Sequence, residues 1–374
     1  APVIRQLVVE RRTGDEAVFF NLTKEILKLD HENHYFLLTD EKEPEKLDFL
    51  RERLGVSNNP HATVVTLVGK NRFLWNLLSL PGYLLRHKLD VYHTQYIAPF
   101  FLPRRTALVT HVHDVSFKAH AEWIGRKDLF FLSLLIPSSL RRSTTIVVPS
   151  LFTKEEVIKF YHVPSEKVVV VSNSFETSWL TLPSNEEQAE AKKRLSLSGP
   201  YFVAAGTMQP RKNIPFLIQA FRRLREKEPR LTLVLTGDPV GHHVDPGVKA
   251  LSEKGEPGIV FTGYLPEKTL RAIIAGSEGL VFPSLYEGFG IPLLEGMASG
   301  VPILASNILP FQEVAGKAAL FFDPASLAEV ENALYTLYID RAAHDMLIAL
   351  GRERLALFSW AKSAEKLLAV YQKS

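Results

Sequence analysis

Short apolar runs alternate with amphipathic stretches along almost the whole chain, as is typical of α/β proteins with parallel sheets. In the first half we expect strands at residues 3–9, 35–38, 63–68, 91–93, 107–111, 146–149 and 168–171, and a helix over 17–29 after a loop at 13–16. In the second half we expect strands at 201–205, 231–236, 259–262, 280–282 and 302–305. Helices are predicted at 215–227, 267–275, from 292 onward and over 359–371. This pattern predicts two doubly wound sheets.

A polar stretch at residues 176–200 separates the two series of strands. It is helical in its middle and ends in Ser198-Gly199-Pro200, which is typical of a linker. A chain of 374 residues is longer than the chains that usually fold around a single hydrophobic core. We therefore expect two domains, with ligands bound at the carboxyl ends of their parallel strands.

Composition narrows the class of protein. The chain is 46% hydrophobic and 23% charged, an ordinary balance for a soluble globular protein. No apolar run approaches the roughly 18 to 20 residues of a transmembrane helix, and residues 1–4 do not resemble the start of a signal peptide. The absence of cysteine excludes disulfides and thiolate metal sites. We expect a cytoplasmic protein.

Charge is distributed unevenly along the chain. Residues 60–150 carry 11 Lys and Arg against 4 Asp and Glu, and they include two apolar, aromatic stretches at 73–80 and 129–136. Two interpretations remain open. The stretches are core helices with a basic solvated face, or residues 70–142 contact an anionic membrane, which would place the protein on the inner face of that membrane. We expect no nucleic-acid partner, because no recognised binding motif accompanies the charge.

The most informative motif spans residues 286–302. It follows an apolar strand, crosses a glycine turn at 288–290 and enters a helix whose first turn contains Pro292. Free backbone N–H groups and the helix dipole make such a turn an anion site. Glu287 stands at the turn, and Glu295 lies about one helical turn further on. A phosphate flanked by two carboxylates that accept hydrogen bonds from hydroxyl groups outlines a sugar-nucleotide site.

A second motif, residues 206–213, follows the first strand of the second half. Gly206 at the strand end lets a ligand approach the backbone. Arg211 and Lys212 supply two cations, and Asn213 is suited to cap the next helix. Because both motifs leave the carboxyl ends of strands in one sheet, we expect them to bind one diphosphate. An exposed basic loop is the alternative for Arg211 and Lys212 taken alone.

The two motifs closely resemble those of the retaining glycosyltransferases of family 4, whose architecture is called GT-B. A glutamate, seven residues and a second glutamate form the family's motif, which Glu287 and Glu295 match. Further similar segments lie at residues 35–40, 90–93, 109–114, 147–150, 171–174 and 358–360. The resemblance implies two Rossmann-like domains facing across a cleft. The N-terminal, acceptor-side domain would comprise residues 1–175 plus 358–374, with a C-terminal helix that crosses back to it, and the donor domain residues 176–357.

The resemblance implies a role for each donor-side residue. Arg211 and Lys212 would neutralise the diphosphate and stabilise the leaving nucleotide. Glu287 would contact the donor sugar near its reacting edge, and Glu295 the ribose hydroxyls. The other donor-side candidates lie around the phosphates, the sugar and the base, and they are Gly206, Thr207, Thr236, Gly237, Tyr264, Leu265, Gly288, Phe289, Gly290 and Ile291.

On the acceptor side, His113 resembles the family's histidine that faces the donor sugar, with Asp114 beside it. His93 fits a structural and a functional role equally well. Gly14 is the single glycine of the loop at 13–16, where the family often has a glycine pair, so an altered acceptor loop, truncation and processing are all open explanations. The expected catalytic residues are His113, Glu287, Arg211 and Lys212.

The resemblance also implies the reaction. We expect a retaining transfer of a hexosyl group from a nucleotide-diphosphate sugar to a glycan or lipid-linked acceptor, in polysaccharide biosynthesis. We expect no metal and no cofactor, because no Asp-x-Asp sequence occurs and cationic side chains supply the charge. The alternatives are a catalytically silent GT-B binding or scaffold subunit and a GT-B nucleotide-sugar epimerase. A nicotinamide dehydrogenase is excluded, because no G-x-G-x-x-G follows a strand.

Overall fold

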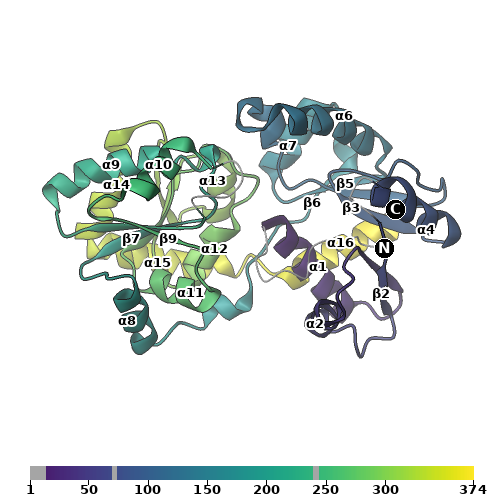
Figure 1. Ribbon diagram of the computed structural model, residues 1–374, viewed down its shortest axis with the longest axis horizontal. Coiled ribbons are helices and arrows are strands. Elements are labelled where there is room, and N and C mark those ends of the chain that lie inside the picture. The colour runs from purple at the N-terminus through teal and green to yellow at the C-terminus, as the bar shows by residue number, and fades with distance from the viewer. Residues whose placement is uncertain (1–13, 70–73, 239–243) are drawn as a thin grey trace. The chain divides into compact units, whose positions relative to one another are not determined.

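The computed structural model describes residues 14–69, 74–238 and 244–374, which divide into two compact units (Figure 1). Unit 1 comprises the described residues up to Ala121 together with Gly125–Ser174 and Ser359–Ser374, and unit 2 comprises Glu122–Ile124 and Phe175–Phe358. The junctions expected from the sequence lie after residue 175 and before residue 358. The strand predicted at 3–9 lies outside the described residues.

Unit 1 contains two parallel sheets. One pairs β1 (Tyr35–Thr39) with β2 (Ala62–Thr66). The other has the order β3-β4-β5-β6, with bounds Val91–Gln95, Ala107–His111, Thr145–Val148 and Val168–Val170. The helices of unit 1 include α1 (Gly14–Leu29), α2 (Pro44–Leu54), η1 (Trp75–Ser79), α4 (Leu80–Arg86), α5 (Ser116–Ala119), α6 (Arg126–Arg142), α7 (Leu151–Tyr161), η3 (Ser165–Lys167) and α16 (Trp360–Lys373), and η2 spans Ala121–Trp123.

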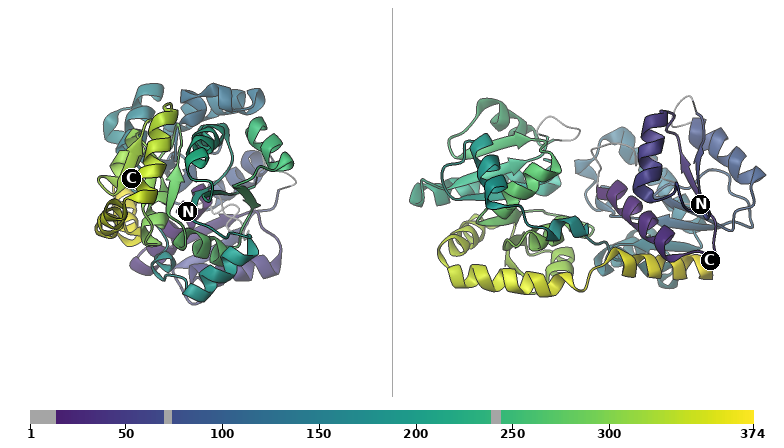
Figure 2. Two further views of the ribbon diagram at one scale, coloured as in Figure 1. Left: turned by 90° about the vertical axis from the view of Figure 1, so that its left-hand side faces the viewer. Right: turned by 90° about the horizontal axis from the view of Figure 1, so that it is seen from below.

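Helix α1 begins earlier than the sequence pattern predicts. The loop expected at 13–16 is wrong over its last three residues, because Gly14 already starts the helix. Asp15 and Glu16 occupy the first turn, where negative charge interacts favourably with the positive end of the helix dipole. The helix buries Phe19 and Leu22, among other residues, and packs along α16 (Figure 2).

Unit 2 is built on one parallel sheet of six strands in the order β12-β11-β10-β7-β8-β9. Their bounds are β7 (Tyr201–Ala205), β8 (Thr232–Thr236), β9 (Ile259–Gly263), β10 (Gly279–Phe282), β11 (Ile303–Ser306) and β12 (Ala319–Phe322). The helices include η4 (Thr177–Leu180), α8 (Asn185–Arg194), η5 (Pro210–Lys212), α9 (Ile214–Lys227), α10 (Pro246–Lys254), α11 (Glu267–Ala275), α12 (Ile291–Ala298), α13 (Leu309–Ala315), α14 (Leu327–Ile339) and α15 (Arg341–Leu355).

The core of unit 2 lies on both faces of this sheet. Successive residues of β7 point to opposite sides, so Tyr201 and Val203 enter one apolar cluster while Phe202 and Ala204 enter the other. Helices α11, α12 and α13 supply the first cluster, and α9, α10 and α14 supply the second. A strand buried on both faces has to be apolar throughout, which explains why β7 shows no alternation.

The structure confirms the doubly wound α/β class predicted from the alternating pattern. Most element ends fall within a residue or two of their predicted positions, the usual uncertainty of such boundaries. Among the residues described, no helix combines the length and the apolar character that crossing a membrane requires.

Candidate functional site

The strand order of unit 2 reverses between β7 and β10, which are hydrogen-bonded neighbours. In open parallel sheets, ligands bind at the carboxyl ends of the strands beside such a reversal. The loop at 206–213 follows β7, and the turn at 283–290 follows β10. The amide of Leu285 donates to the carbonyl of Arg211 at 2.8 Å, so the structure joins the two sequence motifs directly.

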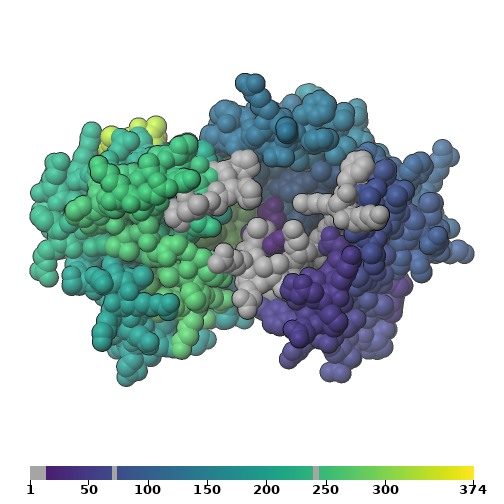
Figure 3. All heavy atoms as spheres, viewed as in Figure 1, coloured from purple at the N-terminus to yellow at the C-terminus, as the bar shows by residue number. Residues whose placement is uncertain are grey.

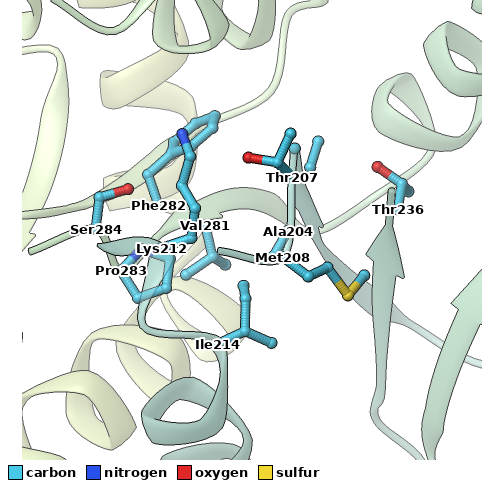
Figure 4. Close-up of a pocket in the computed structure, with 12 residues that line it drawn as sticks. Ala204, Thr207, Met208, Lys212, Ile214, Thr236, Val281, Phe282, Pro283 and Ser284 are labelled. Atoms are coloured by element: carbon cyan, nitrogen blue, oxygen red, sulfur yellow. The ribbon is translucent and has the colours of Figure 1, made fainter. Parts of the chain in front are cut away.

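A small cavity opens between these two loops. Figure 4 shows the Lys212 amine and the hydroxyl groups of Thr207, Thr236 and Ser284 around it. The residues that line it come from the ends of β7, β8 and β10 and the loops that follow, and they are Ala204, Ala205, Gly206, Thr207, Met208, Lys212, Ile214, Thr236, Val281, Phe282, Pro283 and Ser284.

Glycines bring the backbones of three strand ends together beside this cavity. Gly206 donates to the carbonyl of Thr236 at 3.1 Å, and Gly237 donates to that of Gly263 at 3.0 Å. A Cβ atom at Gly237 would lie only 2.0 Å from the Gly206 carbonyl oxygen, and the φ of Gly237 is +133°. Only glycine fits this position, and the close approach brings the loops after β7, β8 and β9 to one point.

Glu287 lies at the centre of the charged groups. Its carboxylate accepts hydrogen bonds from Arg211 Nη1 at 2.7 Å, from Lys212 Nζ at 2.5 Å and from Ser284 Oγ at 2.9 Å. The side chains of Arg211, Lys212 and Glu287 are 22%, 15% and 12% exposed, so the cluster is mostly shielded from water. It therefore holds two cations and one anion at the end of the sheet.

The ionisation of Glu287 follows from these contacts. Burial raises the pKa of its carboxyl group, but the charges of Arg211 and Lys212 and their hydrogen bonds outweigh burial and lower it to about 2. Glu287 is therefore an anion at neutral pH.

The guanidinium of Arg211 has a further hydrogen-bond partner on its own loop. Gln209 Oε1 accepts a hydrogen bond from Arg211 Nε at 3.1 Å and so helps to hold the guanidinium in place.

Asn213 does not cap α9 as expected. Its φ is +55°, no side-chain capping bond forms, and its Nδ2 donates to the carbonyl of Pro324 at 3.0 Å. The left-handed backbone at Asn213 turns the side chain away from the helix amides, so it ties the loop to the chain after β12 instead.

Helix α12 begins at Ile291, directly after Gly290, whose φ is +115°. A Cβ at Gly290 would lie 2.9 Å from the Phe311 ring, so this position also requires glycine. The Phe289 ring packs against Phe358 at a centroid distance of 5.8 Å and is 4% exposed. The side chain of Phe289 therefore belongs to the core of unit 2.

Glu295 lies on α12, about one turn from its start. Burial, followed by the negative charges of Glu176 and Glu267, raises the pKa of its carboxyl group to about 8. The two glutamates of the motif therefore differ in their charge at neutral pH. Gly288 precedes the helix and is buried.

Two of the donor-side candidates, Tyr264 and Leu265, lie directly after β9. Tyr264 is 48% exposed, whereas Leu265 is 8% exposed. Thr236 is buried at the end of β8, and Thr207 is exposed in the loop after β7. An accessible ring beside the converging glycine turns is suited to stack on a planar group.

Unit 1 contains a stack of three histidine rings, one in the middle of β3, one at the end of β4 and one two residues after β4. The rings of His93 and His111 lie 5.7 Å apart and those of His111 and His113 lie 4.4 Å apart, and the Phe19 ring of α1 contacts all three. His93 Nδ1 is 2.7 Å from the hydroxyl of Tyr371 on α16. Burial lowers the pKa of His93 to about 3 and that of His111 well below its usual value, so both are neutral at neutral pH.

The other acceptor-side candidates lie near this stack. His113 Nδ1 is 3.9 Å from Asp15 Oδ1 in the first turn of α1, next to Gly14. The carboxylate of Asp114 accepts hydrogen bonds from the amide and the hydroxyl of Ser116, at 2.9 and 2.8 Å, at the start of α5. Its contacts are therefore those of a local turn residue.

Sequence reasoning did not single out Ser284 and Gln209, although both contact the charged cluster. The serine stands two residues after the apolar end of β10, and Glu287 stands three residues later. A hydroxyl at a strand end, three residues before a carboxylate, is a weak signal that could have marked it. Gln209 carried no such signal, because its role depends on the course of the loop.

The sequence matches two known families. Residues 13–179 match the family described as Glycosyltransferase Family 4, and residues 199–340 match the family described as Glycosyl transferases group 1. The O-antigen chain mannosyltransferase B of Escherichia coli is 30% identical over 278 residues, which are 73% of this chain and 72% of that protein. The serotype-specific mannosyltransferase WbdA of Escherichia coli is 28% identical over 239 residues, 63% of this chain but only 29% of WbdA.

Solved structures show the same fold. The Anabaena protein Alr3699/HepE in complex with UDP-glucose superimposes with a TM-score of 0.76 at 16% identity, over 100% of this chain and 99% of that one. WaaG, a glycosyltransferase involved in lipopolysaccharide biosynthesis, gives a TM-score of 0.73 at 13% identity, over 100% of both chains. These likenesses confirm the predicted GT-B fold.

The fold and the strand-end site thus define a GT-B glycosyltransferase. The chain belongs to glycosyltransferase family 4.

Proposed function

We propose that this glycosyltransferase transfers a hexosyl group, with retention of configuration, from a nucleotide-diphosphate sugar to a glycan or lipid-linked acceptor. The observation that carries the proposal is the cluster of Arg211, Lys212 and Glu287 at the carboxyl ends of β7 and β10. Two cations beside a helix N-terminus suit a diphosphate.

The names of the relatives suggest mannose as the first sugar to test. Both Escherichia coli proteins are described as mannosyltransferases, and one acts on an O-antigen chain. We therefore propose a mannosyl donor and a growing polysaccharide as acceptor. In a thermal-shift panel of GDP, UDP, ADP and dTDP, the correct nucleotide should give the largest stabilisation, because stabilisation rises with the ratio of ligand concentration to dissociation constant.

The proposed reaction assigns different tasks to the site residues. The bond between the sugar C1 and the β-phosphate oxygen breaks, and Arg211 and Lys212 stabilise the charge on the departing nucleoside diphosphate. The acceptor oxygen bonds to C1 from the same face, and its proton passes to the departing phosphate oxygen. Glu287 holds the sugar and Glu295 binds the ribose. His113 of unit 1 is the proposed histidine that faces the donor sugar. An α-linked product from an α-linked donor, identified by NMR, supports retention; a β-linked product refutes it.

We propose that the transfer needs no metal, because Arg211 and Lys212 supply the positive charge beside the diphosphate site. Treatment with EDTA should leave the transfer rate within about twofold, since removing a metal that clamps the diphosphate would cost several kcal/mol. Loss of activity that Mg²⁺ or Mn²⁺ restores would contradict this part of the proposal.

The central test compares donor hydrolysis and acceptor transfer by wild type and Glu287→Ala. Equal rates would remove Glu287 from the catalytic role. Nucleotide binding without transfer to any acceptor in a broad screen would favour the silent binding subunit, and conversion of the donor sugar without an acceptor would favour the epimerase.

We also propose that unit 1 contacts an anionic membrane through one face of α6. Its exposed residues follow helical spacing: Phe130, Phe131 and Leu134 are 66%, 57% and 61% exposed, and Lys127 and Arg141 lie on the same face. The opposite face, which includes Ile136 and Leu140, is buried. Helix α6 lies at the surface of the molecule (Figure 3). Basic groups around exposed aromatic rings suit anionic headgroups, and the chain would then work at the cytoplasmic face.

Liposome co-sedimentation tests this contact. Wild type should bind vesicles that contain phosphatidylglycerol more tightly than neutral vesicles, and binding should weaken with salt. The variant Phe130→Ser/Phe131→Ser should lose most of the binding, whereas Leu309→Ser/Leu357→Ser, which changes two exposed leucines of unit 2, should retain it. Binding that is independent of lipid charge and salt, and that Phe130→Ser/Phe131→Ser does not change, would refute the contact.

A further inference from the structure

Within residues 14–69, 74–238 and 244–374, three side chains donate hydrogen bonds to the carboxylate of Glu287, and they differ in charge. Arg211 bonds to Oε2, while Lys212 and Ser284 both bond to Oε1. Two of these donors are cations, and the third is a neutral hydroxyl. A diphosphate attracts the cations strongly and competes with Glu287 for them, because both ligands are anionic and need the same N–H groups.

The position of Lys212 makes this competition direct. A Cβ placed on Gly206 would lie 4.0 Å from Lys212 Nζ, so the amine stands between the glycine turn after β7 and the carboxylate of Glu287. A phosphate bound at that turn contacts the same amine. Glu287 then shares its cations, yet it has to keep its place to hold the donor sugar.

We propose that Ser284 is the positioning residue that holds Glu287 in place when the donor diphosphate takes over Arg211 and Lys212. This inference rests on the proposed function of the site. A hydroxyl is a weaker partner for phosphate than an ammonium or guanidinium group, so its bond to Glu287 survives donor binding.

The surroundings of Ser284 suit this task. The residue is 1% exposed, and it lies two positions after the end of β10, an inner strand of the sheet. Its Oγ donates to Glu287 Oε1 over 2.9 Å, and the two residues are three positions apart. A buried carboxylate that loses its hydrogen bonds is strongly destabilised, so without Ser284 the Glu287 side chain would leave its position.

The chain offers a matched control in Ser306. This serine is 0% exposed and ends β11, the strand beside β10, and its Oγ donates to the carbonyl of Phe282 at 3.3 Å. Ser306 and Ser284 are both buried hydroxyls at neighbouring strand ends. The hydroxyl of Ser284 donates to Glu287, whereas that of Ser306 donates to the backbone of Phe282, so Ser306→Ala reports the effect of removing a buried hydroxyl in general.

The test compares wild type, Ser284→Ala, Ser284→Thr and Ser306→Ala. Steady-state transfer gives kcat and the donor KM, and calorimetry gives the Kd of GDP and GDP-mannose, or of UDP and UDP-glucose if the thermal-shift panel selects uridine. For Ser284→Ala we expect kcat to fall about 10- to 100-fold, as for loss of a hydrogen bond to a charged group. The Kd of the nucleoside diphosphate should stay within about twofold, because both cations remain.

The threonine variant and the control make the result specific. Ser284→Thr keeps a hydroxyl and should restore most of the rate, and Ser306→Ala should leave kcat within about twofold. Unchanged kcat in Ser284→Ala, an equal loss in Ser306→Ala, or no rescue by threonine in a protein of normal melting temperature would each overturn the inference.

Binding separates this inference from the proposed function. Wild type that binds the nucleoside diphosphate but transfers no sugar refutes the transferase proposal. The positioning role is still tested in that case, because Glu287 should add affinity for the nucleotide sugar over the nucleoside diphosphate. Ser284→Ala should abolish this added affinity, and its persistence would overturn the inference.

Discussion

Glu287 and Glu295 stand eight positions apart and are both shielded from water, yet their pKa values move in opposite directions. Two cations contact Glu287, and they lower its pKa to about 2 against the effect of burial. Burial and neighbouring carboxylates raise the pKa of Glu295 to about 8. Residue identity is the same at both positions, so the neighbours alone decide which glutamate carries charge.

Glu295→Gln should change the pH dependence of stability. The folded state keeps a proton on Glu295 up to about pH 8, whereas the unfolded chain loses it above a pKa of 4.5. The contribution of Glu295 is therefore fully present below about pH 4.5 and is lost as the pH rises through 8, with a total on the order of a few kcal/mol. Urea unfolding at pH 6 and pH 9 should show a larger decline for wild type than for Glu295→Gln. Parallel declines would contradict the raised pKa.

Lys212→Ala should reduce the transfer rate without unfolding the protein. Removing one cation that stabilises the departing phosphate should cost roughly 2 to 4 kcal/mol of transition-state stabilisation, as does the loss of one oxyanion-hole donor. The measurement is kcat/KM for the donor, with the exposed Lys268→Ala as control, because Lys268 pairs with Glu187 on α8 instead. Equal losses in both variants would indicate a general effect of charge.

At the scale of elements, the turns after β7, β8 and β9 pack together because glycine permits their backbones to come into contact. The sequence places a glycine at the end of each of these strands or directly after it, at Gly206, Gly237 and Gly263, but it does not show that two of them meet. This contact depends on strand register, which the pattern of apolar residues does not determine to the residue.

Gly237→Ala should be far more harmful than Gly263→Ala. Both residues have positive φ, but a Cβ at Gly237 would clash with the Gly206 carbonyl at 2.0 Å, whereas nothing lies within 4 Å of one at Gly263. We expect Gly263→Ala to cost about 1 kcal/mol of stability, the strain of a left-handed residue, and Gly237→Ala to cost over about 3 kcal/mol and to weaken nucleotide binding. Thermal unfolding and calorimetry check this, and equal effects would contradict the role of the clash.

At the scale of the molecule, the sequence predicts the order of elements and the donor side of the site, because each strand, glycine turn and helix start is a local pattern. It fails where the outcome depends on distant residues. Asn213 looks like a cap but bonds to Pro324, and Phe289 lies in the motif but packs on Phe358. Ser284 is a third case, since its partner is known only once the turn after β10 has been traced.

The return of the chain to unit 1 through α16 leads to a further prediction. Leu367 is 1% exposed on the helix that packs against α1, so Leu367→Ala should destabilise that contact by about 2 to 5 kcal/mol. Hydrogen exchange measured by mass spectrometry should show faster exchange in α1 and unchanged exchange in β7 and β8. The exposed Gln372→Ala on the same helix is the control. Faster exchange throughout both units would contradict a local effect.

The pairing of α1 with α16 also affects how the chain folds while it is being synthesised. Residues 14–29 and 360–373 lie on either side of all of Phe175–Phe358, so the first helix emerges long before its partner is synthesised. The part of α1 that packs against α16 stays exposed on the nascent chain during that interval, while unit 2 can already fold. Ribosomes stalled before residue 360 should therefore expose this part of α1, where a chaperone can bind.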